Sequence, residues 1–476
     1  MRRTKILATI GPASETAEVL EQMIAAGLNA VRCNFSHGAP EDHERRITLV
    51  RKLAKKAKTT VGILADLQGP KIRVAKFQAG FVELKNGQQF TIDSSLPKDV
   101  GDQNQVGTDY HDLHKDLKKH DMLLLDDGNL VFKVTAVRGT KVICEVIEGG
   151  RLSNNKGINK QGGGLTAPAL TDKDKEDIKT AASLNVDYVA VSFPRDAADI
   201  KLAKRLVKKA GSNAGIIAKI ERAEAVTHID EIIRASDGVM VARGDLAVEI
   251  GEERVPGVQK KIIQRARELD KLVITATQMM ESMIENYVPT RAEVSDVANA
   301  VLDGTDAVML SAETASGKHP IRVIQVMNKV CRAAEEDPST WISGHRVELD
   351  FARVDEAIAM AAMYVANHIN AKAIIALTES GSTALWMSRI SSDLPIYALT
   401  RNDETMGKVT LYRGVFPIAF NSTKMKKDAV NKAAVRELEK RKVMQKGDLA
   451  ILTSGDHMGE HGGTNKLKIV RAGSVI

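Results

Sequence analysis

The chain of 476 residues has few cysteines and few aromatic residues, and it contains no long apolar run. Its three cysteines, Cys33, Cys144 and Cys331, lie far apart, which excludes a disulfide framework or a cysteine-based metal site and is typical of a reducing compartment. No apolar run approaches the roughly 18 residues that a membrane span needs. The run after the basic start of the chain is too short for a signal peptide, because it stops at Gly11-Pro12. We therefore expect a soluble, cytoplasmic protein that binds no membrane.

The sequence also lacks the pattern of a nucleic-acid-binding protein. Lys and Arg number 68 against 61 Asp and Glu, which gives a formal net charge of +7 and a pI of about 9.0. Acidic residues are nevertheless interleaved throughout, and aromatic residues make up only 4%, so no basic stripe studded with aromatic rings is present. Anionic small substrates explain the charge balance equally well, and we expect no nucleic acid as a partner.

Eight short, apolar, β-branched runs alternate with charged segments of helical periodicity. These runs are residues 5–10, 30–34, 61–66, 188–192, 216–220, 239–242, 272–277 and 307–311. Buried strands that alternate with helices are typical of a parallel sheet, and eight such units predict a (β/α)₈ TIM barrel. Enzymes with this fold carry their catalytic groups at the carboxyl ends of the strands.

Two other segments do not belong to the strand–helix alternation of the barrel. Residues 70–167 read as short strands and glycine-rich turns, which predicts an inserted small β-barrel domain. A decorative insertion is the plain interpretation, but the insert leaves the barrel directly after Asp66, on the catalytic face, which favours a lid. From residue 339 the strand–helix pattern restarts. We expect a catalytic barrel of residues 1–69 and 168–338, a lid of residues 70–167, and a C-terminal α/β domain of residues 339–476 for allostery and oligomerisation.

The most informative charges follow the fifth and sixth runs. Lys219 and Glu221 end one strand, and Asp245 follows the next. Charges at the ends of buried strands are costly unless they are paired or bind a ligand. A plain ion pair between Lys219 and Glu221 is one interpretation, but alternate residues of a strand share a face, so both can point at one ligand. Two carboxylates suit Mg²⁺ and a lysine suits a phosphate, which together indicate phosphoryl chemistry.

The other strand ends are also polar. A single Ser or Thr at such a place is more often a helix N-cap than a functional group. Seven polar strand ends together, however, predict one active site at the mouth of the barrel, the end at which the strands have their carboxyl termini. Its further candidates are Arg32, Asn34, Ser36, His37, Asp66, Lys71, Arg73, Thr277 and Ser311.

Several longer motifs carry a specific resemblance. They are residues 34–38 (Asn-Phe-Ser-His-Gly), the block 216–226, residues 242–245 (Ala-Arg-Gly-Asp), residues 276–279 (Ala-Thr-Gln-Met), residues 289–293 (Pro-Thr-Arg-Ala-Glu) and residues 296–300 (Asp-Val-Ala-Asn-Ala). On these motifs the chain resembles the pyruvate kinases, in particular the potassium-independent bacterial branch. The resemblance implies transfer of the phosphoryl group of phosphoenolpyruvate to ADP, giving pyruvate and ATP in glycolysis, and a homotetramer.

The resemblance also implies roles for residues of this chain. Lys219 and Arg32 would hold the phosphoryl oxygens, and Glu221 and Asp245 would bind Mg²⁺, with Mn²⁺ as a possible substitute. The turn at Gly244 and Asp245, before an expected helix, would offer backbone N–H groups to the substrate carboxylate. Thr277, with Ser311, would lie near the carbon that is protonated, in a positioning role. Nucleotide contacts would come from Asn34, His37, Arg73 and Lys156, although His37 could instead be an N-cap or a satisfied polar residue at the start of the next helix. Asp127 either approaches the metal or forms a hairpin turn.

Two positions depart from the family pattern. Many members need K⁺, held by residues that match Asn34, Ser36, Asp66 and the backbone of Leu67. In those members a glutamate occupies the position of Lys71, whose ammonium could replace the ion, so we predict activity without K⁺. Ala247 stands where glycine is usual, and it would be strained only if that position needs φ > 0.

The third domain contains a candidate effector loop after the apolar run 374–377. The loop offers hydroxyl and backbone groups at a strand-to-helix turn, from Thr378, Ser380, Gly381, Ser382 and Thr383. Glu379 stands where bisphosphate-regulated members often have Lys, which favours a monophosphate such as a sugar monophosphate or AMP over fructose 1,6-bisphosphate. An ordinary N-cap without a regulator is the alternative.

Two other functions compete with the kinase. A lyase or aldolase of the phosphoenolpyruvate barrel class would also pair carboxylates at strand ends, but it gives no reason for the lid. A non-enzymatic sensor of nucleotides or sugar phosphates would be favoured by loss of Lys219, Glu221 or Asp245, and all three are present.

Overall fold

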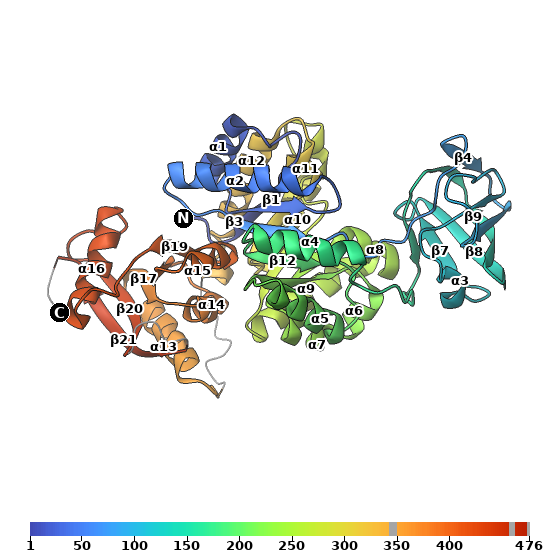
Figure 1. Ribbon diagram of the computed structural model, residues 1–476. Helices are drawn as coiled ribbons and strands as arrows, with labels where there is room; N and C mark the ends of the chain where they lie inside the picture. The colour runs from blue at the N-terminus through green and yellow to red at the C-terminus, as the bar shows by residue number, and fades with distance from the viewer. Residues whose placement is uncertain (342–349, 457–461, 474–476) are drawn as a thin grey trace.

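The computed structural model describes residues 1–341, 350–456 and 462–473. Three parts follow one another in space: the C-terminal domain, a central barrel and the insert (Figure 1). Within the described residues, no helix combines the length and the apolar character that crossing a membrane requires.

Eight parallel strands close the central barrel, as the alternating pattern predicts. The strands are β1 (Lys5–Thr9), β2 (Ala30–Asn34), β3 (Gly62–Asp66), β12 (Tyr188–Val191), β13 (Gly215–Ile220), β14 (Gly238–Ala242), β15 (Leu272–Ala276) and β16 (Ala307–Leu310). Each is almost wholly buried, which explains their continuous apolar sequences. The outer helices are α1 (Ala17–Ala26), α2 (Pro40–Lys56), α4 (Asp172–Ser183), α5 (Ala197–Lys209), α7 (Ile229–Ala235), α9 (Val255–Glu268), α10 (Arg291–Leu302) and α12 (Pro320–Ala334).

Local capping signals set where several of these helices begin. Thr290 and Glu293 form a reciprocal capping box at α10, and Thr171 and Asp174 form one at α4. Asp174 also accepts a hydrogen bond from the backbone N–H of Gly69 at 3.1 Å, through its other carboxylate oxygen. The start of α4 therefore fixes the chain where it leaves the barrel for the insert.

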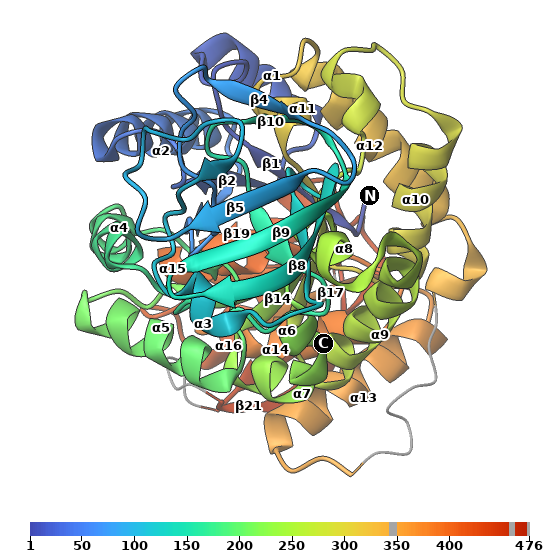
Figure 2. The ribbon, with the colours of Figure 1, turned by 90° about the vertical axis from the view of Figure 1, so that its right-hand side faces the viewer.

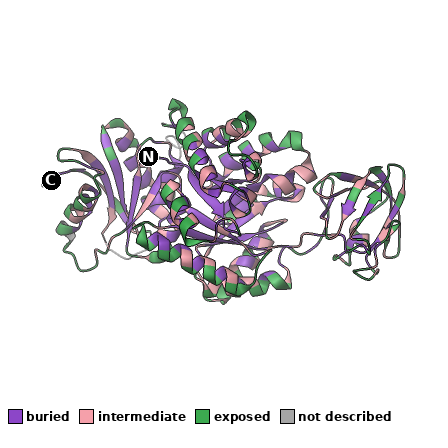
Figure 3. Cartoon of the chain, turned by 90° about the horizontal axis from the view of Figure 1, so that it is seen from above, coloured by how far each residue is buried: buried purple, intermediate pink, exposed green. Residues whose placement is uncertain are grey.

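The insert is an all-β unit with its own apolar core, formed by residues between Ile72 and Ala167. Its six-stranded sheet contains β5 (Gln89–Asp93), β6 (Gln105–Val106), β7 (Met122–Leu125), β8 (Leu130–Arg138), β9 (Lys141–Glu148) and β11 (Ile158–Lys160), and β4 (Phe81–Leu84) pairs separately with β10 (Gly150–Ser153). The insert lies over the carboxyl ends of the barrel strands, in front of the barrel in Figure 2. Only narrow segments of chain join it to the barrel (Figure 3).

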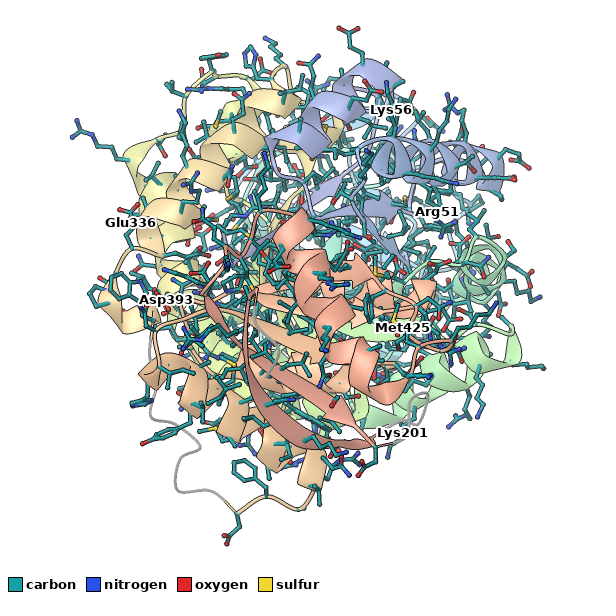
Figure 4. The ribbon with its side chains drawn as sticks, turned by 90° about the vertical axis from the view of Figure 1, so that its left-hand side faces the viewer. Arg51, Lys56, Lys201, Glu336, Asp393 and Met425 are labelled. Atoms are coloured by element: carbon teal, nitrogen blue, oxygen red, sulfur yellow. The ribbon has the colours of Figure 1, made fainter. Side chains whose placement is uncertain are left out.

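The C-terminal domain covers the opposite end of the barrel. Its five-stranded sheet has the order β19 (Val415–Ala419), β18 (Ile396–Thr400), β17 (Ala371–Leu377), β20 (Leu449–Gly455) and β21 (Thr464–Arg471), and only the last strand is antiparallel. The helices α13 (Val354–His368), α14 (Ser382–Arg389), α15 (Asp403–Lys408) and α16 (Lys427–Lys440) flank the sheet. Figure 4 views the molecule from this end, with the domain in front of the barrel.

Candidate active site

Lys219 lies at the centre of a buried cluster of charges at the barrel mouth. Its Nζ is 2.9 Å from Glu221 Oε1 and 3.3 Å from Asp66 Oδ1. It also donates to Ser192 Oγ at 2.7 Å. Burial lowers the pKa of Lys219, but the charges of Asp66 and Glu221 outweigh burial and raise it, so the amine stays protonated.

Arg32 brings a second cation to the same carboxylate. Its Nε lies 2.6 Å from Asp66 Oδ2, and its Nη1 donates to Thr9 Oγ1 at 3.0 Å. Burial tends to raise the pKa of Asp66, but the charges of Lys219 and Arg32 hold it below the usual value. Asp66 therefore stays ionised and orients two cations, from β2 and β13, toward one space.

Glu221 and Asp245 are the two carboxylates predicted to hold Mg²⁺. Burial raises the pKa of Glu221, Lys219 opposes that shift, and the negative charge of Asp245 adds to it. Electrostatic repulsion between the two carboxylates is what a divalent cation would relieve. The described residues contain no cluster of three or more metal-binding side chains. Mg²⁺ is commonly bound by one or two carboxylates together with substrate oxygens and water, and Glu221 and Asp245 are a donor set of that kind. The residues fit the ion in that way.

Thr277 has a strained backbone directly after β15. Its φ of 68° is unusual for a β-branched residue. The Arg243 side chain donates to the Thr277 carbonyl at 2.6 Å and contacts both oxygens of Asp296 at 2.7 Å. The sequence identified Arg243 only as part of a motif, and its role in holding Thr277 was missed.

The helix that carries Asp245 begins earlier than expected. We expected the Arg243-Gly244-Asp245 turn to precede a helix, but α8 (Arg243–Ile250) already includes it. The Gly244 N–H, expected to face the substrate carboxylate, donates to Thr277 Oγ1 at 2.9 Å. Ala247 lies inside α8 and is not in the left-handed region, so alanine carries no strain there.

Ser311 ends β16 and precedes the short helix α11 (Ala312–Ala315). Its backbone N–H donates to Glu313 Oε2 at 2.6 Å, and Glu313 Oε1 accepts from the Met280 N–H at 3.2 Å. Glu313 therefore ties the end of the eighth strand to the loop after Thr277. Among the described residues the hydrogen bonds do not join Ser311 to Thr277 directly.

The loop after β2 places Asn34, Ser36 and His37 at the rim. Asn34 Oδ1 accepts from the Ser36 N–H at 3.2 Å, and His37 is exposed. Ala39 occupies the N-cap position of α2, so the interpretation of His37 as an N-cap is wrong.

The insert contributes Arg73, Lys156 and Asp127 to the same side. Arg73 Nη1 donates to the Asn155 carbonyl at 2.9 Å, and Lys156 Nζ is 2.6 Å from Asp126 Oδ1. Asp126 and Asp127 both have positive φ between β7 and β8, so Asp127 does form part of a hairpin turn.

Lys71 lies close to the carboxylate of a predicted metal ligand. Its Nζ is 3.0 Å from Asp245 Oδ1 and 3.3 Å from Asp127 Oδ1. Burial lowers the pKa of Lys71, but Asp245 and Asp127 outweigh burial and raise it, so the group is cationic. We predicted Lys71 in the region of Asn34, Ser36, Asp66 and Leu67, but its ion pairs are with Asp245 and Asp127, whereas Asp66 pairs with Arg32 and Lys219.

The candidate effector loop lies between β17 and α14. Gly381 has a φ of +83°, and its N–H donates to Thr378 Oγ1 at 2.9 Å. Ser380 and Ser382 share a hydrogen bond at 2.9 Å. The side chains of the loop line a pocket together with Arg401, which is 3.2 Å from Glu379. The sequence did not identify Arg401, because it follows a different strand.

Comparisons with known proteins agree with this geometry. Residues 1–324 match the family model "Pyruvate kinase, barrel domain", and residues 356–470 match "Pyruvate kinase, alpha/beta domain". The chain is 56% identical to "Pyruvate kinase II" of Salmonella typhimurium over 99% of this chain and 98% of that protein. It is 55% identical to a pyruvate kinase of Haemophilus influenzae over 96% of each.

A solved structure extends the likeness to three dimensions. A pyruvate kinase from Cryptosporidium parvum superposes with a TM-score of 0.93 at 36% identity, over 99% of this chain and 96% of the other. The fold, the charges at the barrel mouth and both family models therefore agree, and the chain belongs to the pyruvate kinase family.

Proposed function

We propose that this pyruvate kinase transfers the phosphoryl group from phosphoenolpyruvate to ADP at the barrel mouth, with Mg²⁺ but without K⁺. Activity without K⁺ is supported by the position of Lys71, whose ammonium lies 3.0 Å from Asp245. A fixed positive charge at the mouth can take the electrostatic role that a monovalent cation has in other members. Mg²⁺, held by Glu221 and Asp245, would neutralise charge on the phosphoryl oxygens and orient them.

The other residues of the mouth position the reactants. Phosphoryl transfer passes through a loose transition state with negative charge on the peripheral oxygens. Lys219 and Arg32, both oriented by Asp66, would hold those oxygens with fixed positive charges. Thr277, whose backbone is held by Arg243, would lie near the substrate carbon that receives a proton and would act there together with Ser311.

Nucleotide binding and assembly are inferred from the family. Arg73 and Lys156, together with Asn34 and His37, would contact ADP from the insert and the barrel rim, so that the insert acts as a lid. We further infer a cytoplasmic homotetramer, which light scattering of the purified enzyme would check.

Turnover in a buffer free of K⁺ and Na⁺ tests this proposal. Phosphoenolpyruvate and ADP, supplied as Tris salts with Mg²⁺, are coupled to lactate dehydrogenase for the wild type and Lys71→Glu. We expect full wild-type activity without K⁺, whereas Lys71→Glu should lose about tenfold or more, because a fixed cation is replaced by a charge that repels Asp245. Wild-type activity only after addition of KCl at constant ionic strength would contradict the role of Lys71. Absence of ADP-dependent turnover even with K⁺ would favour the lyase or the sensor.

We also propose that the loop of Thr378, Ser380, Gly381, Ser382 and Thr383 binds a phosphorylated activator. Hydroxyl groups and the first turn of α14 suit one phosphate, and Arg401 at the pocket adds a cation. A sugar monophosphate or AMP is favoured, because Glu379 occupies the position that bisphosphate-regulated members often give to Lys. Activation by glucose 6-phosphate or AMP, but not by fructose 1,6-bisphosphate, is the expected result of adding each to the coupled assay.

A further inference from the structure

The chain returns from the insert to the barrel through three consecutive glycines in left-handed conformations. Gly162, Gly163 and Gly164 have φ values of +78°, +81° and +98°. Only glycine adopts such angles at little cost, so the path of this segment depends on its sequence. The outgoing connection has one such glycine, Gly69, whose backbone is held by Asp174.

Barrel residues bind the backbone of this return segment at four of its positions, 162, 164, 165 and 166. The Gly162 N–H donates to the Glu249 carbonyl at 3.0 Å, and the Gly164 N–H donates to Glu224 Oε1. Arg222 donates to the Leu165 carbonyl at 2.9 Å. Arg195 donates to the Thr166 carbonyl at 3.1 Å. The segment is therefore clamped, although its glycines would allow it many other paths.

The Glu224 carboxylate packs directly against position 163, where a φ of +81° also favours glycine. A Cβ atom added to Gly163 would lie 2.5 Å from Glu224 Oε2, which is shorter than any ordinary contact. That oxygen is buried and has no hydrogen-bond partner among the described residues. A buried hydrogen-bond acceptor that lacks a partner costs free energy. The hydrogen bond from the Gly164 N–H to the other carboxylate oxygen keeps Glu224 at this place despite that cost.

Three of the four clamp residues, Arg222, Glu224 and Glu249, lie close in the sequence to the candidate metal ligands. Arg222 and Glu224 come one and three residues after Glu221, and Glu249 belongs to α8, whose first turn carries Asp245. Any movement of the return segment therefore acts on the two segments that carry Glu221 and Asp245.

We propose that Glu224 is a positioning residue that couples the placement of the insert to that of the catalytic strand end. It touches neither substrate nor metal; it accepts the Gly164 N–H and packs against Gly163, so that Arg73 and Lys156 of the insert meet the barrel mouth. The proposal rests on the proposed function for the roles of those residues, but the clamp itself can be measured without turnover.

Two variants and a control test the proposal in the full-length enzyme. Glu224→Ala removes the acceptor, whereas Glu224→Gln keeps an amide oxygen for the Gly164 N–H. Glu176→Ala, which removes an exposed glutamate that forms an ion pair with Lys179 on α4, is the control. Hydrogen–deuterium exchange of residues 160–167 and the separate KM values for ADP and phosphoenolpyruvate are measured, together with thermal unfolding.

For Glu224→Ala we expect exchange of residues 160–167 to rise about tenfold, as for loss of one hydrogen bond to a charged group. The KM for ADP should rise about fivefold or more while the KM for phosphoenolpyruvate changes less than about twofold, because two of the proposed ADP contacts, Arg73 and Lys156, lie on the insert. Glu224→Gln should bring both the exchange rate and the KM for ADP most of the way back to the wild-type values. Glu176→Ala should change neither. Unchanged exchange or an unchanged KM for ADP in Glu224→Ala would overturn the proposal, and so would a fall in thermal stability that Gln does not restore. If the wild type shows no turnover with ADP, the proposed function fails, while the exchange result still tests the clamp.

Discussion

The barrel carries buried charges at both ends, and the two ends hold them in different ways. At the base, against the C-terminal domain, Asp306 and Arg389 pair with each other at 1% exposure each. The two oxygens of Asp306 also accept from the backbone N–H groups of Val273 and Arg413, at 2.9 and 3.0 Å. Every acceptor of this carboxylate is thus used by the protein itself.

At the mouth, the three carboxylates of Asp66, Glu221 and Asp245 lie among three cations, Arg32, Lys219 and Lys71. Burial and the like charges of Asp245 and Asp66 raise the pKa of Glu221, although Lys219 opposes them. The ionised form of Glu221 is therefore disfavoured in the protein alone, and a bound divalent cation would stabilise it. The comparison follows the general division of this fold, in which the carboxyl end of the strands carries the chemistry and the opposite end carries stability.

The largest expected loss of stability is at the base. Asp306→Asn keeps the shape but leaves Arg389 buried without its counter-charge, and breaking a buried pair in this way costs about 3–5 kcal/mol. We expect a clearly lower urea midpoint, with turnover per folded molecule little changed. Asp112→Asn, at an exposed pair with Lys115, is the matched control and should leave the urea midpoint almost unchanged. Equal urea midpoints for Asp306→Asn and Asp112→Asn would show that the buried charges at the base do not stabilise the fold, which would contradict the contrast between the two ends of the barrel.

A smaller, pH-dependent effect is expected at the junction with the insert. Burial and the charge of Glu224 raise the pKa of Glu249 from 4.5 to about 7, against the opposing hydrogen bond from Ala223 and the charge of Arg222. Because the folded state binds this proton more tightly than the unfolded state, wild-type stability falls as the pH rises from about 4.5 through about 7.

Glu249→Gln carries no such charge and should therefore be more stable than the wild type at pH 8, by roughly 3 kcal/mol at most. At pH 5 the stability of Glu249→Gln should differ little from that of the wild type. Thermal unfolding at the two pH values measures this, and a gain of equal size at both would show that the ionisation of Glu249 is not its cause.

The sequence predicted the architecture well, because buried strands and helix caps are local signals. The closed eight-stranded barrel, an all-β insert and a C-terminal α/β domain are all present. The sequence also led to the charges that the barrel gathers: Lys219, Glu221 and Asp66 meet at the mouth.

The contacts between distant side chains could not be predicted. The pairing of Lys71 with Asp245, of Arg401 with Glu379, and of Arg243 with Thr277 each joins segments that only the closure or the register of a sheet brings together. No periodicity encodes such pairs. The roles of the site residues themselves remain predictions for mutagenesis.

Turnover and thermal unfolding of Glu221→Gln, measured on one preparation, test the contrast between the two ends most directly. The variant keeps an oxygen for the Phe193 N–H, which Glu221 Oε2 accepts at 2.8 Å. It removes a charge that burial and Asp245 disfavour more than Lys219 favours it, and Lys219 keeps its ion pair with Asp66. We expect turnover to fall by about a thousandfold or more, since a proposed metal ligand is lost, while the unfolding midpoint stays level or rises. Retained turnover, or a midpoint that falls as far as that of Asp306→Asn, would contradict the account.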